Sequence, residues 1–171
     1  MILTEGGGTH YPPHPAGQFA AVCIDVIDMG IVDTQWGSKP KVKLRFYAGQ
    51  VHQMEDGPTE AWVDGYFTAS LHEKANLRGF LEAWRGRAFT GEELRGFDTE
   101  QLIGVPCYLN VVHNHADNGR TYANIGSVMG LPSGSQAPAI PADYQRVKDR
   151  DEQPDTATNG SDNPLDDSMP F

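Results

Sequence analysis

One stretch of the sequence combines positive charge with an aromatic ring at regular spacing. In Lys39-Pro-Lys-Val-Lys-Leu-Arg-Phe-Tyr47 every second residue is basic until the last, which is tyrosine. Side chains alternate between the two faces of a strand, so the cations form one row, about 7 Å apart. Successive phosphates of an extended nucleic-acid strand have comparable spacing, and rings stack on bases. The row consists of Lys39, Lys41, Lys43, Arg45 and Tyr47.

Three further rings are suited to stacking. Trp36 precedes the row in a polar loop, where a tryptophan gains little burial, and Trp62 and Tyr66 share the more polar face of a following strand. An exposed ring that stacks on a base contributes about 1–3 kcal/mol. The alternatives are that the row is a solvated face or a lysine-protected edge strand, and that Trp62 and Tyr66 cover the end of the core. The charges fit either interpretation, and the rings favour a single-strand groove.

Residues suited to metal binding or catalysis form no recognisable set. His113-Asn-His115 places two rings on one strand face, and His10 and His14 are possible additions, but the spacing fixes no third ligand. No Walker loop, nucleophile elbow or deaminase signature occurs. We therefore expect no enzyme, no metal and no cofactor. Three acids that would suit a metal-dependent nuclease are expected where a strand runs into a turn, a common place for aspartate: Asp25, Asp28 and Asp33.

The residue pattern predicts a mainly β fold. Strands are expected at 19–27, 41–47 and 62–70, followed by a helix over 72–84 that ends at Gly86. A helical turn with a capping box is expected at Thr90-Gly-Glu-Glu93, and another helical turn after Asp98. The last two strands, 105–115 and 121–128, are expected to form a hairpin. Three strands, a helix and two strands are the element order of the OB-fold, a five-stranded Greek-key barrel. An SH3-like barrel or an α+β sandwich shares this order.

Composition divides the chain into three parts. We expect a loosely ordered segment over residues 1–18, the barrel over 19–131, and a disordered acidic tail over 132–171 with at most a helical turn around 143–148. The tail is rich in proline and polar residues, so it buries too little apolar surface to offset a backbone entropy of about 1–2 kcal/mol per residue.

The net charge of −10 argues at first against a nucleic-acid partner. Residues 1–131 hold 10 basic and 15 acidic residues, a net of −5, and residues 132–171 hold 3 and 8, also −5. Half of the excess therefore lies in the expected tail.

Other sequence features predict a cytoplasmic protein. Cys23 and Cys107 lie in apolar segments without a Cys-x-x-Cys spacing, which indicates buried thiols and no disulfide framework. No stretch approaches 18 consecutive apolar residues, so we expect no membrane span. The first ten residues also lack the basic and apolar regions of a secretory signal.

The last six residues form a short linear motif. An aromatic side chain and a carboxylate suit a pocket, and the preceding acids suit basic surroundings. The alternative is an arbitrary acidic tail that maintains solubility. The motif, here named the tip, consists of Asp166, Asp167, Ser168, Met169, Pro170 and Phe171.

The tip resembles that of bacterial single-stranded DNA-binding proteins (SSBs). Residues 19–131 do not resemble the bacterial SSB domain, but they resemble phage-encoded proteins of the SSB type through Ser70-Leu-His-Glu-Lys-Ala-Asn-Leu-Arg78, Trp84-Arg-Gly-Arg-Ala-Phe-Thr90 and Cys107-Tyr-Leu-Asn-Val-Val-His113.

The resemblance implies an OB domain that coats single-stranded DNA, with little sequence preference, during replication, recombination and repair. It also implies a tip that recruits replication and repair enzymes, and a location in the host cytoplasm if the protein is phage-encoded. It leaves the oligomeric state open, a homo-oligomer included. The alternative is a protein-binding barrel whose tail mimics the host SSB tip. The expected DNA-binding residues are Trp36, Lys39, Lys41, Lys43, Arg45, Tyr47, Trp62 and Tyr66.

Overall fold

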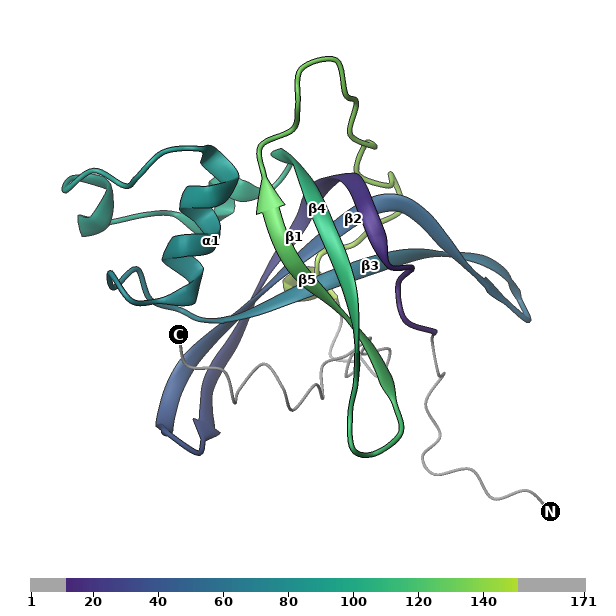
Figure 1. Cartoon of the computed structure of the whole chain (residues 1–171), viewed down its shortest axis with the longest axis horizontal. Helices are drawn as coiled ribbons and strands as arrows, with labels where there is room; N and C mark the ends of the chain where they lie inside the picture. The colour runs from purple at the N-terminus through teal and green to yellow at the C-terminus, as the bar shows by residue number, and fades with distance from the viewer. Residues whose placement is uncertain (1–11, 151–171) are drawn as a thin grey trace.

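The computed structural model describes residues 12–150 as one curled antiparallel sheet with a single α-helix against it (Figure 1). The strands are β1 (Gly17–Thr34), β2 (Gly37–Met54), β3 (Gly57–Thr68), β4 (Pro106–His115) and β5 (Thr121–Met129). The helix α1 (Asn76–Arg85) follows β3, and three short 3-10 helices complete the elements: η1 (Glu93–Arg95), η2 (Thr99–Leu102) and η3 (Val147–Asp149). The prediction of a mainly β fold with a helix between the third and fourth strands is confirmed.

The sheet has the order β3-β2-β1-β4-β5, and its two outer strands, β3 and β5, contact each other. One long strand makes this curvature possible. Residues 17–22 of β1 pair with β4, whereas residues 22–34 pair with β2. Because β1 belongs to both ladders, it turns the sheet back on itself.

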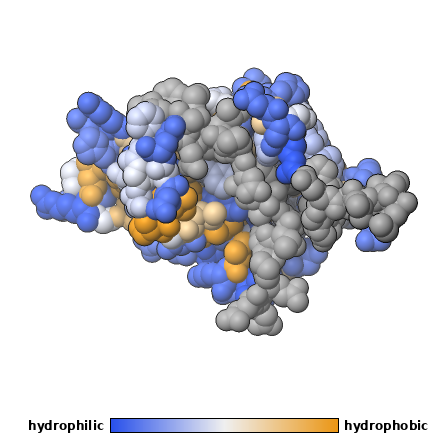
Figure 2. Space-filling view, turned by 90° about the horizontal axis from the view of Figure 1, so that it is seen from below, coloured by the Kyte–Doolittle hydropathy of each residue, from blue (hydrophilic) through white to orange (hydrophobic). Residues whose placement is uncertain are grey.

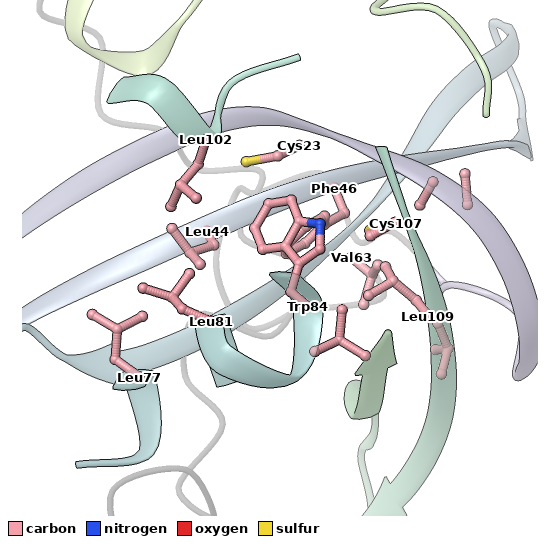
Figure 3. Packing of buried hydrophobic residues seen from close by; sticks show 14 of the residues in the cluster. Cys23, Leu44, Phe46, Val63, Leu77, Leu81, Trp84, Leu102, Cys107 and Leu109 are labelled. Atoms are coloured by element: carbon pink, nitrogen blue, oxygen red, sulfur yellow. The ribbon is translucent and has the colours of Figure 1, made fainter. Parts of the chain in front are cut away.

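The helix closes the core between β3 and β5. Leu77, Leu81 and Trp84 lie on its buried face, as their spacing predicts, and the Trp84 Nε1–H donates to the Pro106 carbonyl oxygen at 2.9 Å. Gly86 ends the helix with φ 73°, a left-handed conformation that favours glycine. Trp84 packs among strand residues that include Leu44 and Phe46 (Figure 3). The buried face of the sheet is therefore the one that carries Leu44, as predicted.

Two other local predictions are confirmed. The capping box forms: the Thr90 N–H donates to Glu93 Oε1 at 3.0 Å, and the Glu93 N–H donates to Thr90 Oγ1 at 3.2 Å. The pKa of Glu93 is lowered to about 2. The hydrogen bond from the Thr90 N–H is the largest cause, and a hydrogen bond from the Arg85 side chain is the next. Cys23 and Cys107 are free, buried thiols, and burial raises the pKa of Cys23 to about 12.

The structure differs from expectation in the β1–β2 hairpin and in the segments before β1 and after β5. β1 and β2 extend beyond the predicted strands and form a long hairpin that turns at residues 34–37. His14 lies in the segment that was expected to be loose, yet it is buried, and its ring meets Phe19 edge-on at 5.2 Å. Residues 132–150, which were expected to be disordered, are described by the structure, and part of this segment packs on the sheet.

Candidate functional site

The outer face of β1–β3, opposite the core, brings the predicted sheet residues together. Four of the five residues of the basic row lie opposite a residue of β3, whereas Lys39 pairs with Val32 of β1. The antiparallel register pairs Lys41 with Thr68, Lys43 with Tyr66, Arg45 with Asp64, and Tyr47 with Trp62. The alternation of side chains therefore builds one mixed surface of cations and rings.

Two of the cations are buried, which the sequence analysis did not expect. Arg45 is 1% exposed and Lys43 is 4% exposed. Arg45 donates two hydrogen bonds from its guanidinium to the carboxylate of Asp64, from Nε to Oδ1 at 2.9 Å and from Nη2 to Oδ2 at 3.1 Å. The Lys43 Nζ lies 3.9 Å from Asp64 Oδ2. An open row of phosphate-binding cations is therefore wrong for these two residues, because Asp64 between them neutralises part of their charge.

The buried cations support the rings of β3. The Arg45 guanidinium lies 5.8 Å from the centre of the Trp62 ring, and the Lys43 Nζ lies 5.5 Å from the centre of the Tyr66 ring. Cations over ring faces attract the π electrons and fix the ring orientation. Trp62 and Tyr66 are half-buried.

Asp25 is a member of this face that the sequence analysis assigned elsewhere. It lies within β1, not at the start of a turn, and a β-bulge between Cys23 and Asp25 changes the alternation. Cys23 faces the core, and without the bulge Asp25 would face it too; instead Asp25 pairs with Arg45 and Val26 rejoins the core side. The bulge thus delivers a fully buried carboxylate to the outer face.

Residues 141–150, here named the strap, lie over Asp25 and Trp62. Asp25 accepts hydrogen bonds from the Tyr144 hydroxyl at 2.8 Å, the Arg146 Nε at 2.9 Å and the Val147 N–H at 2.9 Å. The Tyr144 ring meets the Trp62 ring edge-on, with centres 5.2 Å apart. Burial, more than any other cause, raises the pKa of the Tyr144 hydroxyl. A local sequence pattern gives no signal for these contacts, because the partners are about 120 residues apart in the chain.

The accessible part of the predicted site is the β1–β2 hairpin. Trp36 is 58% exposed at its turn, Lys39 is exposed, and Lys41 is half-buried with its Nζ 3.2 Å from Thr68 Oγ1. Met29 and Ile31 are exposed on the β1 arm. Figure 2 views the molecule from the side toward which this hairpin points in Figure 1, and it shows hydrophobic patches among hydrophilic surface.

Metal-ligating residues do not converge within residues 12–150. No group of three or more His, Cys, Asp or Glu side chains in this range could hold a metal ion. The His113 Nε2 bonds to the backbone oxygen of His14 at 2.6 Å. Asp28 and Asp33 bond within the hairpin, Asp28 with the Gly30 N–H and Asp33 with the Ser38 hydroxyl. The three acids considered for a nuclease therefore have separate partners: Asp28 and Asp33 bond within the hairpin, and Asp25 bonds to the strap.

An open groove of about 450 Å³ lies between the edge of β1 and residues 131–140. Its lining, which includes Val22, Pro106 and Ile140, contains no charged side chain. The groove therefore offers no cation to a phosphate.

Three further findings concern the tip, the helices and the similarity of the chain to known proteins. The tip, residues 166–171, lies outside the described residues, as does His10. Within residues 12–150 no helix is long and apolar enough to cross a lipid bilayer. No protein-family model matches the chain, and no curated protein matches it.

Proposed function

We propose that this chain is a non-enzymatic single-stranded DNA-binding protein built on an OB-fold. In this proposal it coats single strands, with little sequence preference, during replication, recombination and repair. The connectivity supports the fold: β1 pairs with β2 and β4, β3 lies beside β5, and α1 falls between β3 and β4. OB-folds bind oligonucleotides on the face of their second and third strands and through the loop between the first two.

One observation carries the proposal: the rings and cations lie on those two surfaces. Trp36, Lys39 and Lys41 are accessible on the β1–β2 hairpin, and Trp62 and Tyr66 continue the surface on β3. Cations that follow a backbone, together with rings that stack on bases, are what sequence-independent binding of single strands requires.

The buried cations have a supporting role in this proposal. Arg45 and Lys43 hold Trp62 and Tyr66 in place, and Asp64 neutralises part of their charge. Phosphate contact then depends chiefly on Lys39 and Lys41. Two phosphate contacts to a single strand give a slope of log affinity against log salt of about −1.4, a small value that suits an acidic chain.

A charge-reversal pair with a matched control tests this arrangement. Lys39→Glu/Lys41→Glu should weaken binding to oligo-dT roughly tenfold at low salt and reduce the salt slope by about 1.4, because two phosphate contacts are lost. Arg87→Glu/Arg95→Glu makes the same charge change at exposed positions after α1 and in η1, and it should leave affinity and slope close to wild type. Equal weakening by both pairs would mean that net charge, not this surface, controls binding.

The proposal assigns recruitment of replication and repair enzymes to the tip. A second candidate function is a protein-interaction module whose tail mimics the host SSB tip, and the exposed Met29 and Ile31 beside Trp36 favour it, because apolar side chains suit a protein surface. Absence of oligo-dT binding by the folded chain would select this second function.

A further inference from the structure

The strap contacts Trp62, one of the rings to which the proposed function assigns base stacking. In Figure 1 the chain leaves β5, rises above the sheet and returns to it at residues 141–150. There Tyr144 contacts Trp62 from one side while Arg45 lies over the Trp62 ring at 5.8 Å. The Arg150 guanidinium lies 5.6 Å from the centre of the Tyr144 ring. Tyr144 thus makes a ring contact that a nucleobase would otherwise make.

Asp25 anchors the strap. Its carboxylate accepts one hydrogen bond each from Tyr144, Arg146 and Val147. Arg146 also donates to both carboxylate oxygens of Glu100, at 2.6 and 3.2 Å, and to the Val26 carbonyl oxygen at 3.2 Å. Arg146 therefore joins the strap to β1 and to η2 at the same time. Hydrogen bonds to Glu100, and to a smaller extent to Asp25, raise the pKa of the Arg146 guanidinium, so Arg146 stays charged.

The anchor is separable from the barrel. No strap residue belongs to the buried core cluster, and the strap is held mainly by polar contacts and by the Tyr144 ring. If the strap leaves, Asp25 does not lose all its neighbours of opposite charge, because Arg45 lies opposite it in the β1–β2 ladder. The sheet can therefore remain folded with the strap displaced.

We infer that the strap is an intramolecular competitor that a single strand must displace to reach Trp62 and the centre of the sheet face. This inference rests on the proposed function. The competing groups are an aromatic ring and a guanidinium, Tyr144 and Arg146, and not the acids at the end of the chain. The strap and a strand of DNA compete for the ring of Trp62. The hairpin with Trp36 is accessible to DNA whether the strap is docked or displaced.

The test measures oligo-dT binding by full-length variants. Tyr144→Ala and Arg146→Ala should each bind about three- to tenfold more tightly than wild type. Such a gain corresponds to a binding-competent fraction of about a third to a tenth in the wild-type protein. Asp25→Asn should also tighten binding, and the double variant with Arg146→Ala should gain less than the sum of the two single gains, because both changes remove the Arg146–Asp25 ion pair.

The matched control is Lys148→Ala, on the same strap but with a side chain that is 58% exposed and 3.7 Å from Glu100. It should bind like wild type. Trypsin supplies a second measurement, since it cleaves after Arg146, Lys148 and Arg150: oligo-dT should speed cleavage at these sites in the wild-type protein by displacing the strap.

The outcomes separate this inference from the proposed function. If wild type binds oligo-dT but Tyr144→Ala and Arg146→Ala bind with equal or lower affinity, competition is wrong and the DNA-binding proposal stands. Protection of the strap from trypsin by oligo-dT would also overturn competition, because the strap would then be part of the binding surface. If the folded wild type and all variants fail to bind, both proposals are wrong.

Discussion

The Arg45–Asp64 pair is the residue-level contact on which the sheet face depends most. Both side chains are at most 2% exposed, and they join β2 to β3 directly beneath Trp62. A buried charge that loses its partner keeps its desolvation cost without the compensating attraction. Asp64 is therefore needed for folding before any ligand is considered.

We expect Asp64→Asn to lower the free energy of unfolding by about 3–5 kcal/mol, because it removes the carboxylate that pairs with the buried Arg45 and Lys43. Urea unfolding followed by circular dichroism measures this. The control, Lys148→Gln, removes an ion pair whose two side chains are 58% and 46% exposed, and it should leave stability unchanged. A loss no larger for Asp64→Asn than for the control would show that the buried pair is not a structural contact.

His14 supplies a residue-level pH dependence. It is 1% exposed, its Nε2 has no hydrogen-bond partner among residues 12–150, and burial lowers its pKa from the ordinary 6.5. Burial lowers the pKa of His52 as well, and His52 and His113 add smaller repulsive contributions at His14. The folded state therefore binds these protons less readily than the unfolded state.

Stability from the neutral histidines should be fully present above pH 6.5 and decline as the pH falls through the lowered folded-state pKa, because the unfolded chain takes up protons first. His14→Phe should reduce the loss of unfolding free energy between pH 7.5 and pH 5.5. The exposed His115→Gln should retain the wild-type loss. An unchanged pH profile in His14→Phe would exclude His14 as its source.

At the scale of elements, the contact between β3 and β5 depends on Gly65. A Cβ at this position would lie 2.9 Å from the Phe67 ring and 3.3 Å from Ile125 of β5, so the side chains of both strands must shift to admit it. Gly79, on α1, has open space around its Cβ position. The two glycines form a matched pair for the same substitution.

Gly65→Ala should destabilise the fold by about 1–3 kcal/mol, the usual cost of overpacking. Gly79→Ala should stabilise it by about 0.5–1 kcal/mol, because alanine is the better helix former. Thermal unfolding of both variants checks the signs. Stabilisation by Gly65→Ala would mean that β3 and β5 are not tightly joined.

Sequence patterns could predict most elements but not the departures from regular pairing. The alternation of Lys41–Tyr47 gave the correct two faces of β2, and Gly86 marked the end of α1 correctly. The bulge before Asp25 could not be predicted, because strict alternation assigns Asp25 to the same face as Cys23. One inserted residue therefore changed an apparent turn acid into the anchor of the strap.

Burial of the basic row could not be predicted for a related reason. Spacing shows which residues share a face, but not that Asp64 pairs with Arg45 across the ladder. The strap was missed because its proline-rich and polar composition argues against a core, and its contacts with Asp25 and Trp62 depend on residues far away in the chain. Polar docking of a segment onto a sheet leaves no periodicity in the sequence.

At the scale of the whole molecule, an acidic chain carries a local surface of cations and rings that we propose binds single-stranded DNA. The net charge of −10 opposes nucleic acid at long range, so binding must come from Trp36, Lys39 and Lys41 at short range and from stacking on the sheet. In our inference, the strap limits how much of that sheet a strand of DNA can reach. These statements all depend on one central claim, which is binding of single-stranded DNA by the outer face and its hairpin.

Titration of the full-length protein with oligo-dT, followed by tryptophan fluorescence at low and moderate salt, tests that claim most directly. Trp84 is buried in the core, so a change in emission reports mainly Trp36 and Trp62. The account predicts saturable quenching that weakens only modestly with salt and that decreases in Trp36→Phe. The claim would be contradicted if oligo-dT at low salt changed neither the fluorescence nor the electrophoretic mobility of the folded protein.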